Sequence, residues 1–247
     1  MTRRPLDQRD VMVVVPAFNE ERSIGGVVEA VSRIGFEVVV VSDGSTDGTA
    51  AVARSHGARV LDLPINLGVG GALRTGFKFA IENGFDAVVQ VDADGQHPPD
   101  EITRLVEVAN DSGADMVIGS RFLNGRPSMD VVGIRRIAMR VLARSAGAAV
   151  GAPITDATSG FRLIRQPLLG QFAVHFANNY LGDTYEAVVS AGRAGYRVVE
   201  THATLTDRLH GESTASTGSA VRFTLKGLGV AALGLHKRLR TIESAPR

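Results

Sequence analysis

Two aspartates, Asp92 and Asp94, stand two residues apart directly after the apolar run 87–91. Carboxylate oxygens are the ligands that hard divalent cations prefer, and two of them at this spacing can converge on one ion. Such a cation would neutralise a diphosphate and make it a better leaving group. Gln96 or His97 could complete the site. A solvated acidic turn is the alternative, but the strand before the pair and the two prolines after it favour a metal site.

A second candidate site is the segment Asp-Gly-Ser-Thr-Asp at 43–47, which also follows an apolar run. The carboxylate of Asp43 could accept hydrogen bonds from a base N–H or a ribose hydroxyl. The alternative is an Asp-Gly turn in which Asp47 or Thr46 caps the next helix. Both can hold, with Asp47 capping and Asp43 binding.

The third candidate is the glycine-rich segment Asn-Leu-Gly-Val-Gly-Gly-Ala-Leu-Arg at 66–74. It is not a dinucleotide-binding fingerprint, because that pattern follows the first strand of a sheet and has three spaced glycines. We expect a loop that lets the main chain approach a ligand, with Arg74 on the following helix. A surface salt bridge is the alternative role for Arg74.

The elements that position these residues alternate along the first half of the chain. Apolar runs and helical spacing predict strands at 11–16, 37–42, 58–63, 87–91 and 116–119, and helices at 19–33, 50–55, 72–83 and 101–112. Pro16 should end the first strand, and Ser23 could cap the first helix. Alternation of this kind predicts an α/β fold with a mainly parallel sheet sandwiched by helices. Ligands then bind at the carboxyl ends of the strands, where the polar motifs fall.

The second half of the sequence is less regular. We expect a helix at 131–150, a loop and short strand at 155–165, a helix at 184–192, a strand at 196–202 and a C-terminal helix at 221–239. The arginines on the first of these helices (Arg135, Arg136, Arg140 and Arg144) are typical of a solvated helix face. The C-terminal helix could pack on the domain or lie at a membrane interface. The predicted organisation is an N-terminal tail (1–10), one domain (11–212), and a C-terminal loop and amphipathic helix (213–247).

Composition excludes several classes of protein. The 247 residues carry a net charge of +1, which gives no argument for nucleic acid as a partner. The absence of cysteine excludes disulfides and thiolate metal sites. No secretory signal and no run of about 18 apolar residues is visible, so any work at a membrane would be done on its surface. The expected location is the cytoplasm, either free or peripheral on the cytoplasmic face of the membrane.

Six motifs stand in the order seen in family 2 glycosyltransferases, and within them the chain resembles the dolichyl- and polyprenyl-phosphate mannosyl- and glucosyltransferases. The resemblance covers roughly residues 11–212 and is far more specific than any single motif. The motifs are Val-Pro-Ala-Phe-Asn-Glu (15–20), Val-Ser-Asp-Gly-Ser-Thr-Asp-Gly-Thr (41–49), Asn-Leu-Gly-Val-Gly-Gly-Ala (66–72), Asp-Ala-Asp-Gly-Gln-His-Pro-Pro (92–99), Gly-Ser-Arg-Phe (119–122) and Thr-Asp-Ala-Thr-Ser-Gly-Phe-Arg (155–162).

The resemblance implies a GT-A fold and an inverting enzyme that uses a GDP- or UDP-sugar with Mg²⁺ or Mn²⁺. It implies nucleoside contacts from Pro16, Phe18, Glu20 and Asp43, and a metal held by Asp92, Asp94 and Gln96.

For the acceptor, the resemblance implies that Arg121 and Arg135 bind a phosphate and that Asp156 and Ser159 line the acceptor or sugar side. Arg208 and the stretch 211–213 match a late basic loop that can close over the diphosphate. A phosphate acceptor is already a nucleophile at neutral pH, so arginines need only orient it. A hydroxyl acceptor would need a carboxylate base, and Asp156 is then the candidate. Its alternative role is a turn cap.

The leading hypothesis is therefore hexose transfer from a nucleotide-sugar to a polyprenyl phosphate. One rival keeps the donor and uses a glycan or small-molecule hydroxyl as acceptor. A nucleotidyltransferase would need a lysine-bearing phosphate loop after the first strand, which residues 15–20 do not form. A catalytically inactive nucleotide-sugar-binding protein is the remaining alternative, and the intact aspartate pair counts against it.

Overall fold

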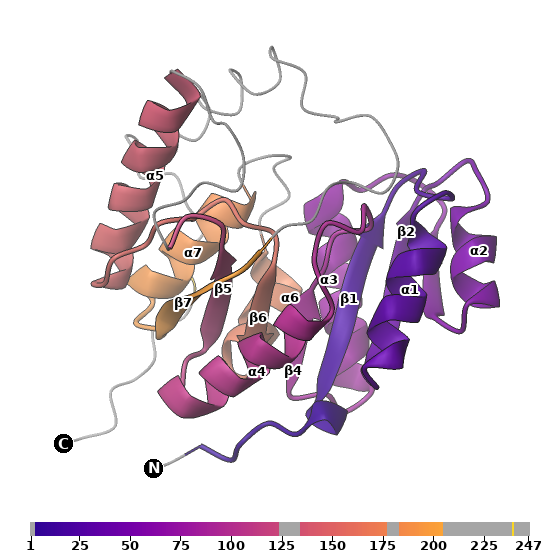
Figure 1. Cartoon of the computed structure of the whole chain (residues 1–247), viewed down its shortest axis with the longest axis horizontal. Coiled ribbons are helices and arrows are strands. Elements are labelled where there is room, and N and C mark those ends of the chain that lie inside the picture. The colour runs from indigo at the N-terminus through magenta and orange to yellow at the C-terminus, as the bar shows by residue number, and fades with distance from the viewer. Residues whose placement is uncertain (1–2, 124–133, 177–182, 205–238, 240–247) are drawn as a thin grey trace.

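The computed structural model describes residues 3–123, 134–176, 183–204 and 239 of the chain. Within them, one 7-stranded sheet runs in the order β3-β2-β1-β4-β6-β5-β7 (Figure 1). The strands are β1 (Val11–Ala17), β2 (Glu37–Asp43), β3 (Arg59–Leu63), β4 (Ala87–Gln90), β5 (Met116–Ser120), β6 (Arg162–Arg165) and β7 (Val198–His202). The helices are η1 (Gln8–Asp10), α1 (Ile24–Arg33), α2 (Thr49–Ser55), α3 (Val69–Glu82), α4 (Asp100–Ser112), α5 (Ile134–Val150), α6 (Leu168–His175) and α7 (Asp183–Arg193).

The sheet is parallel except at one strand. β1 pairs in parallel with β2 and β4, β2 with β3, and β5 with β7. β6 lies between β4 and β5 and is antiparallel to both. The start of β6 therefore lies at the same edge as the ends of its two neighbours. This confirms the predicted α/β class, and it brings the segment before β6 to the edge where the polar motifs gather.

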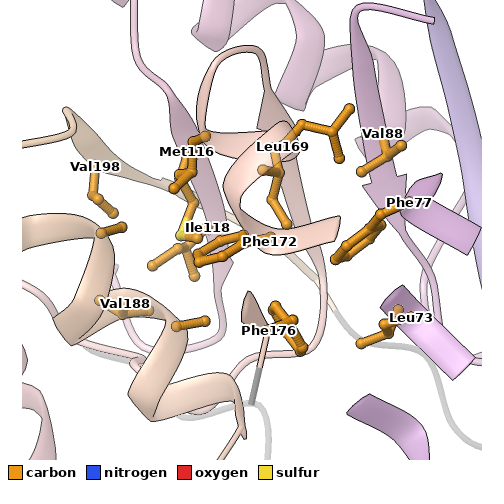
Figure 2. Packing of buried hydrophobic residues seen from close by; sticks show 14 of the residues in the cluster. Leu73, Phe77, Val88, Met116, Ile118, Leu169, Phe172, Phe176, Val188 and Val198 are labelled. Atoms are coloured by element: carbon orange, nitrogen blue, oxygen red, sulfur yellow. The ribbon is translucent and has the colours of Figure 1, made fainter. Parts of the chain in front are cut away.

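Apolar layers cover both faces of the sheet. One core cluster joins the sheet to α3, α5, α6 and α7, and the other joins the opposite face to α1, α2 and α4. Figure 2 shows part of the first cluster, in which Phe172 and Phe176 of the α6 region lie between Phe77 of α3 and the residues of β5. The rings of Phe77 and Phe176 meet edge to face, with their centroids 5.5 Å apart. The sheet that carries the site is thus held rigidly from both sides.

Three predictions about elements were wrong in detail. β1 continues through Pro16 to Ala17. β4 pairs with β1 only as far as Val14, so at Pro16 the strand is paired with β2 alone. Proline, which has no N–H to donate, is tolerated where one side of a strand is unpaired. α1 begins at Ile24 rather than at Asn19. Ser23 is its N-cap residue, as predicted, but its hydroxyl donates to Glu20 and makes no capping hydrogen bond. Helix α6 was not predicted.

The N-terminal segment, predicted as a tail, packs on the edge of the sheet opposite the polar motifs. Leu6 is buried, and its main chain exchanges two hydrogen bonds with the side chain of Asn110 on α4. Arg3 forms an ion pair of 2.6 Å with the buried Asp115. The predicted C-terminal loop and helix lie outside the described residues, apart from Leu239. In the described ranges, no helix combines the length and the apolar character that crossing a bilayer would require.

Candidate active site

The carboxyl ends of β1, β2, β4 and β5 and the start of β6 share one edge of the sheet. The chain leaves β4 toward Asp92 and Asp94, and it leaves β5 toward Arg121. The segment that enters β6 carries Asp156 and Gly160 to the same edge. The topology thus brings together residues that lie far apart in the sequence.

The two aspartates after β4 form one acidic cluster with the segment before β6. Asp94 is buried, and its Oδ1 accepts a hydrogen bond of 3.1 Å from the main-chain N–H of Gln96. The carboxylate of Asp92 rests against the main chain of Gly160. A Cβ atom at Gly160 would lie 3.0 and 3.1 Å from the two carboxylate oxygens. Glycine at this position therefore gives Asp92 the room to keep its carboxylate there.

Arg121 and Asp156 form a two-pronged ion pair beside this cluster. The Nε and Nη2 atoms of Arg121 donate to the two carboxylate oxygens of Asp156, at 2.6 and 2.8 Å. Nη2 also donates to the hydroxyl of Thr158. Burial alone would lower the pKa of Arg121, but the hydrogen bond and the charge of Asp156, with the charge of Asp92, raise it above its ordinary value. The arginine therefore stays positively charged next to the two aspartates.

His97 lies close enough to Asp92, Asp94 and Arg121 for their charges to act on its ring. Its ring stacks on Phe161, with the ring centroids 4.7 Å apart, and its buried Nδ1 makes no hydrogen bond in the described part of the chain. Burial lowers the pKa of His97, and Arg121 adds to this lowering, although the charges of Asp92 and Asp94 oppose it. A neutral imidazole at neutral pH adds no positive charge that would compete with a cation at the aspartates.

Two charged residues at this edge, one half-buried and one fully buried, were missed by the sequence analysis. Glu200 on β7 accepts hydrogen bonds from the main chain of Thr155 and Asp156. Arg162, fully buried at the start of β6, donates to the main-chain oxygens of Ser159 and Thr184. The only signal for Arg162 was its place in a quoted motif. Glu200 stood inside the predicted strand at 196–202, so its position gave no signal of a role in the site.

The loops after β1 and β2 form the other half of the edge, and they interlock by hydrogen bonds. Oδ1 of Asn19 accepts from the N–H of Thr46 at 2.8 Å, and the N–H of Glu20 donates to the hydroxyl of Thr49. Asp47 accepts from the N–H of Thr49, the first residue of α2, but the N-cap position itself is held by Gly48 and not by the predicted Asp47 or Thr46. These hydrogen bonds therefore join the two loops into one unit.

Asp43 links this unit to the glycine-rich loop before α3. Its side chain is buried, and Oδ1 accepts a hydrogen bond of 2.7 Å from the N–H of Leu67. Phe18 in the first loop is 49% exposed and Leu67 is 44% exposed, so both present apolar surface at this edge. An aromatic ring and an aliphatic side chain of this kind suit the face of a nucleobase.

The remaining predicted site residues lie as follows. Pro16 is in β1, and the carboxylate of Glu20 accepts from the hydroxyl of Ser23. Arg74 is on α3 and forms no ion pair with any described residue, so the alternative role in a surface salt bridge is not found there. The side chain of Arg135 and the whole of Arg208 lie outside the described residues.

The aspartate cluster fits a divalent cation that is shared with a substrate. In the described ranges, no group of three or more His, Cys, Asp or Glu side chains converges in a way that could hold a metal alone. The seating of Asp92 against Gly160, beside the buried Asp94, offers oxygen donors from two carboxylates. Mg²⁺ is commonly bound by one or two carboxylates together with substrate phosphates and waters, so this donor set suits a metal–diphosphate complex.

The family model for glycosyl transferase family 2 matches residues 12–172, which include every element that carries this cluster except β7. The chain belongs to this family. It is 32% identical to the undecaprenyl-phosphate mannosyltransferase of Micrococcus luteus over 93% of this chain and 98% of the relative. It is 30% identical to the polyprenol monophosphomannose synthase of Mycolicibacterium smegmatis over 96% of this chain and 91% of that protein.

A solved structure confirms the GT-A-type fold. Glucosyl-3-phosphoglycerate synthase from Mycobacterium tuberculosis, in complex with Mn²⁺ and UDP-glucose, superposes with a TM-score of 0.67. The two proteins are 24% identical, and the match covers 92% of this family 2 glycosyltransferase and 80% of the synthase. At this identity the likeness concerns the fold.

Proposed function

We propose that this family 2 glycosyltransferase moves a hexose from a UDP- or GDP-sugar to a polyprenyl phosphate, with inversion at the anomeric carbon. The observation that carries the proposal is the juxtaposition of Asp92 and Asp94 with the charged Arg121 at one edge of the sheet. The two aspartates could bind the cation that accompanies the donor diphosphate, and the positively charged arginine could bind an anionic acceptor. The names of the two relatives, which match nearly the whole chain, support the same acceptor class.

In the proposed reaction, an oxygen of the acceptor phosphate bonds to the anomeric carbon while the bond from that carbon to the diphosphate breaks. The nucleoside diphosphate leaves with the electron pair. Mg²⁺ or Mn²⁺, held by Asp92 and Asp94 with Gln96 beside them, would supply positive charge to the departing diphosphate. Pro16, Phe18, Glu20 and Asp43 would hold the nucleoside, with Arg74 on the donor side. Arg135 and Arg208 keep their expected roles at the acceptor phosphate and the diphosphate.

The state of Asp156 supports a phosphate acceptor over a hydroxyl. A hydroxyl acceptor would need a carboxylate free to take its proton. The side chain of Asp156 is fully buried, and both of its oxygens accept hydrogen bonds from Arg121. Using it as a base would break that ion pair during the reaction. A phosphate oxygen is already anionic and needs orientation only, which is what a fixed arginine supplies.

Turnover with labelled donors tests the proposal. The purified protein, with Mn²⁺ or Mg²⁺ and a short polyprenyl phosphate, is incubated with UDP- and GDP-linked glucose and mannose, and labelled lipid is counted. We expect one donor to give labelled lipid, EDTA to stop the reaction, and Asp94→Asn to lose at least 100-fold, a rough figure for losing a group that stabilises the leaving charge. Glu37→Gln, an exposed change at the far end of β2, is the matched control.

Other results would redirect the proposal. Nucleotide release that requires a glycan or a small hydroxyl compound and gives no labelled lipid would establish the hydroxyl-acceptor alternative. Donor binding without consumption of any donor, in the presence of each acceptor, would establish a binding protein. Labelled lipid that forms equally well in EDTA would remove the metal from the mechanism.

A further inference from the structure

Glu200 of β7 makes a three-pronged contact next to the candidate active site. Its Oε2 accepts hydrogen bonds of 2.8 Å from both the N–H and the hydroxyl of Thr155, and its Oε1 accepts one of 2.8 Å from the N–H of Asp156. The hydroxyl of Thr155 also lies 2.6 Å from the hydroxyl of Ser120 at the end of β5. Glu200 therefore ties the segment before β6 to β7, and the hydroxyl of Thr155 ties the same segment to β5.

We propose that Glu200 is a positioning residue that fixes the main chain at Thr155 and Asp156 and, through Asp156, sets the orientation of Arg121. The proposal rests on the function proposed above only for the consequence on catalysis. The relay itself is a property of the fold: β7 holds Glu200, Glu200 holds the backbone of Asp156, and Asp156 holds two nitrogens of Arg121.

The charge of Glu200 is difficult to explain by stability alone. Burial raises the pKa of its carboxyl, and the charge of Asp156 adds to this, although the hydrogen bonds from Thr155 and Asp156 oppose it. In the described part of the chain, Glu200 forms no ion pair with an arginine or lysine. A carboxylate that is partly buried beside another carboxylate costs stability. The Glu200 carboxylate provides two strong acceptor oxygens for three donors: the N–H and hydroxyl of Thr155 and the N–H of Asp156.

The last group in this series of contacts is the guanidinium of Arg121. With Nε and Nη2 committed to Asp156, Nη1 of Arg121 makes no hydrogen bond to any described residue. Nη1 is therefore the part of the fork that is available to an anion. A shift of the Asp156 backbone would rotate the guanidinium and move Nη1. Errors of about 1 Å in the placement of such a group can cost about 100-fold in rate.

The first arm of the test observes Arg121 directly and does not depend on any activity. The ¹H–¹⁵N signal of its Nε–H group is assigned by its loss in Arg121→Lys. We expect Glu200→Gln to move or broaden this signal, because the amide presents an N–H₂ to one of the three donors in place of an oxygen. Glu37→Gln should leave it unchanged. An Arg121 signal that is the same in wild type and Glu200→Gln overturns the proposal, whatever reaction the protein catalyses.

The second arm measures rates with the donor and acceptor that the wild type uses. We expect Glu200→Gln to lower kcat about 10- to 100-fold, the range for groups that orient an active-site residue, with a donor KM within about twofold of wild type. When Glu200→Gln is combined with Asp156→Asn, kcat should fall little further than in Asp156→Asn alone, because both residues act through Arg121. Equal losses in the two backgrounds would show an effect independent of Asp156 and would overturn the relay.

A second variant keeps the test decisive if Glu200→Gln does not fold. Thr155→Val removes one of the three hydrogen bonds to Glu200 and retains both main-chain bonds. It should produce a smaller change in the same signal and in the same direction, and no change overturns the proposal. A wild type that consumes no donor would count against the proposed function alone, since the Arg121 signal would still report on the relay.

Discussion

The two halves of the polar edge are built by different physical means. At the ends of β1 and β2, hydrogen bonds join the loops and no described ion pair takes part, as in the hydrogen bond from Thr46 to Asn19. At the ends of β4 and β5, fully or partly buried charges meet, as in the pair of Arg121 and Asp156. A neutral hydrogen bond at the surface contributes about 1 kcal/mol, whereas a buried charge left without its partner costs several. Substitutions should therefore have graded effects in the first half and abrupt effects in the second.

The largest effect is expected from breaking the ion pair of Arg121 and Asp156. Asp156→Ala leaves the guanidinium without its carboxylate, and removing one member of a buried pair typically costs about 3–5 kcal/mol. Because Arg121 retains some exposure to solvent, we expect the lower end of that range. Denaturant unfolding measures the loss. Arg121→Met together with Asp156→Leu should recover much of the stability and none of the transfer activity; a double variant as unstable as the sum of the singles would contradict the pairing.

A smaller effect is expected from crowding the ring that supports His97. A methyl group on Gly119 of β5 would overlap the ring of Phe161 and lie 3.0 Å from the Cβ of Ala203. Overpacking of a core position costs about 1–3 kcal/mol, and here it also displaces the ring on which His97 stacks. Gly119→Ala should therefore lower both the thermal midpoint and the rate.

The matched control for that change is Gly26→Ala in α1, where a Cβ meets no atom within 4 Å. Alanine in the interior of a helix is favoured over glycine, so this variant should be as stable as wild type or more stable. A Gly119→Ala protein that behaves like Gly26→Ala would show that the Phe161 ring can move aside freely.

The same contrast explains what the sequence could and could not predict. The first half of the edge follows from local patterns: β1 and β2 are apolar strands that end at Ala17 and Asp43, and turn residues follow each. The roles of Asp156 and Glu200 depend on β6 running antiparallel between β4 and β5, which no local pattern in its four residues specifies. The sequence identified Arg121 and Asp156 as separate candidates, but only the strand order shows that they bind each other.

Two further differences have the same origin. α1 was expected to start at Asn19, yet the main-chain N–H groups of residues 19–21 donate to Ser45, Asp47 and Thr49 after β2 instead. Helix α6 carries apolar residues on much of its surface, since it packs between α3 and the sheet, so no polar face marked it in the sequence. In both places tertiary contacts outweighed local preference.

In the half of the edge formed by the loops after β1 and β2, an intermediate loss of stability is expected at Asn19, which is held at a positive φ of 56°. Asparagine tolerates this conformation, and alanine pays about 1 kcal/mol for it. Asn19→Ala also removes the acceptor for Thr46, worth about another 1 kcal/mol. Asn19→Gly relieves the strain and still lacks the acceptor, so its loss of stability should be about half as large. Equal losses would mean that only the hydrogen bond matters.

The smallest effect is expected at Asp47, which is exposed and accepts hydrogen bonds at the start of α2 and from Glu21. Burial tends to raise the pKa of its carboxyl, but the hydrogen bonds from Thr49 and from the Glu21 main chain outweigh this and lower it below the ordinary value. The unfolded chain therefore binds the proton more tightly than the folded one, so this contribution is present above the ordinary pKa near 3.8 and is lost as the pH falls through the lower folded value.

Asp47→Asn keeps one acceptor oxygen and replaces the other, so it should flatten the acid limb of the stability curve below about pH 4 and cost about 1 kcal/mol or less at neutral pH, the size of one hydrogen bond. Unfolding by urea at pH 7 and at pH 3 measures both effects. The transfer rate should hardly change, because the loops after β1 and β2 keep their other hydrogen bonds. A loss of rate as large as that of Asp156→Ala would show that the two halves of the edge are coupled. The expected difference between graded effects in one half and abrupt effects in the other would then be wrong.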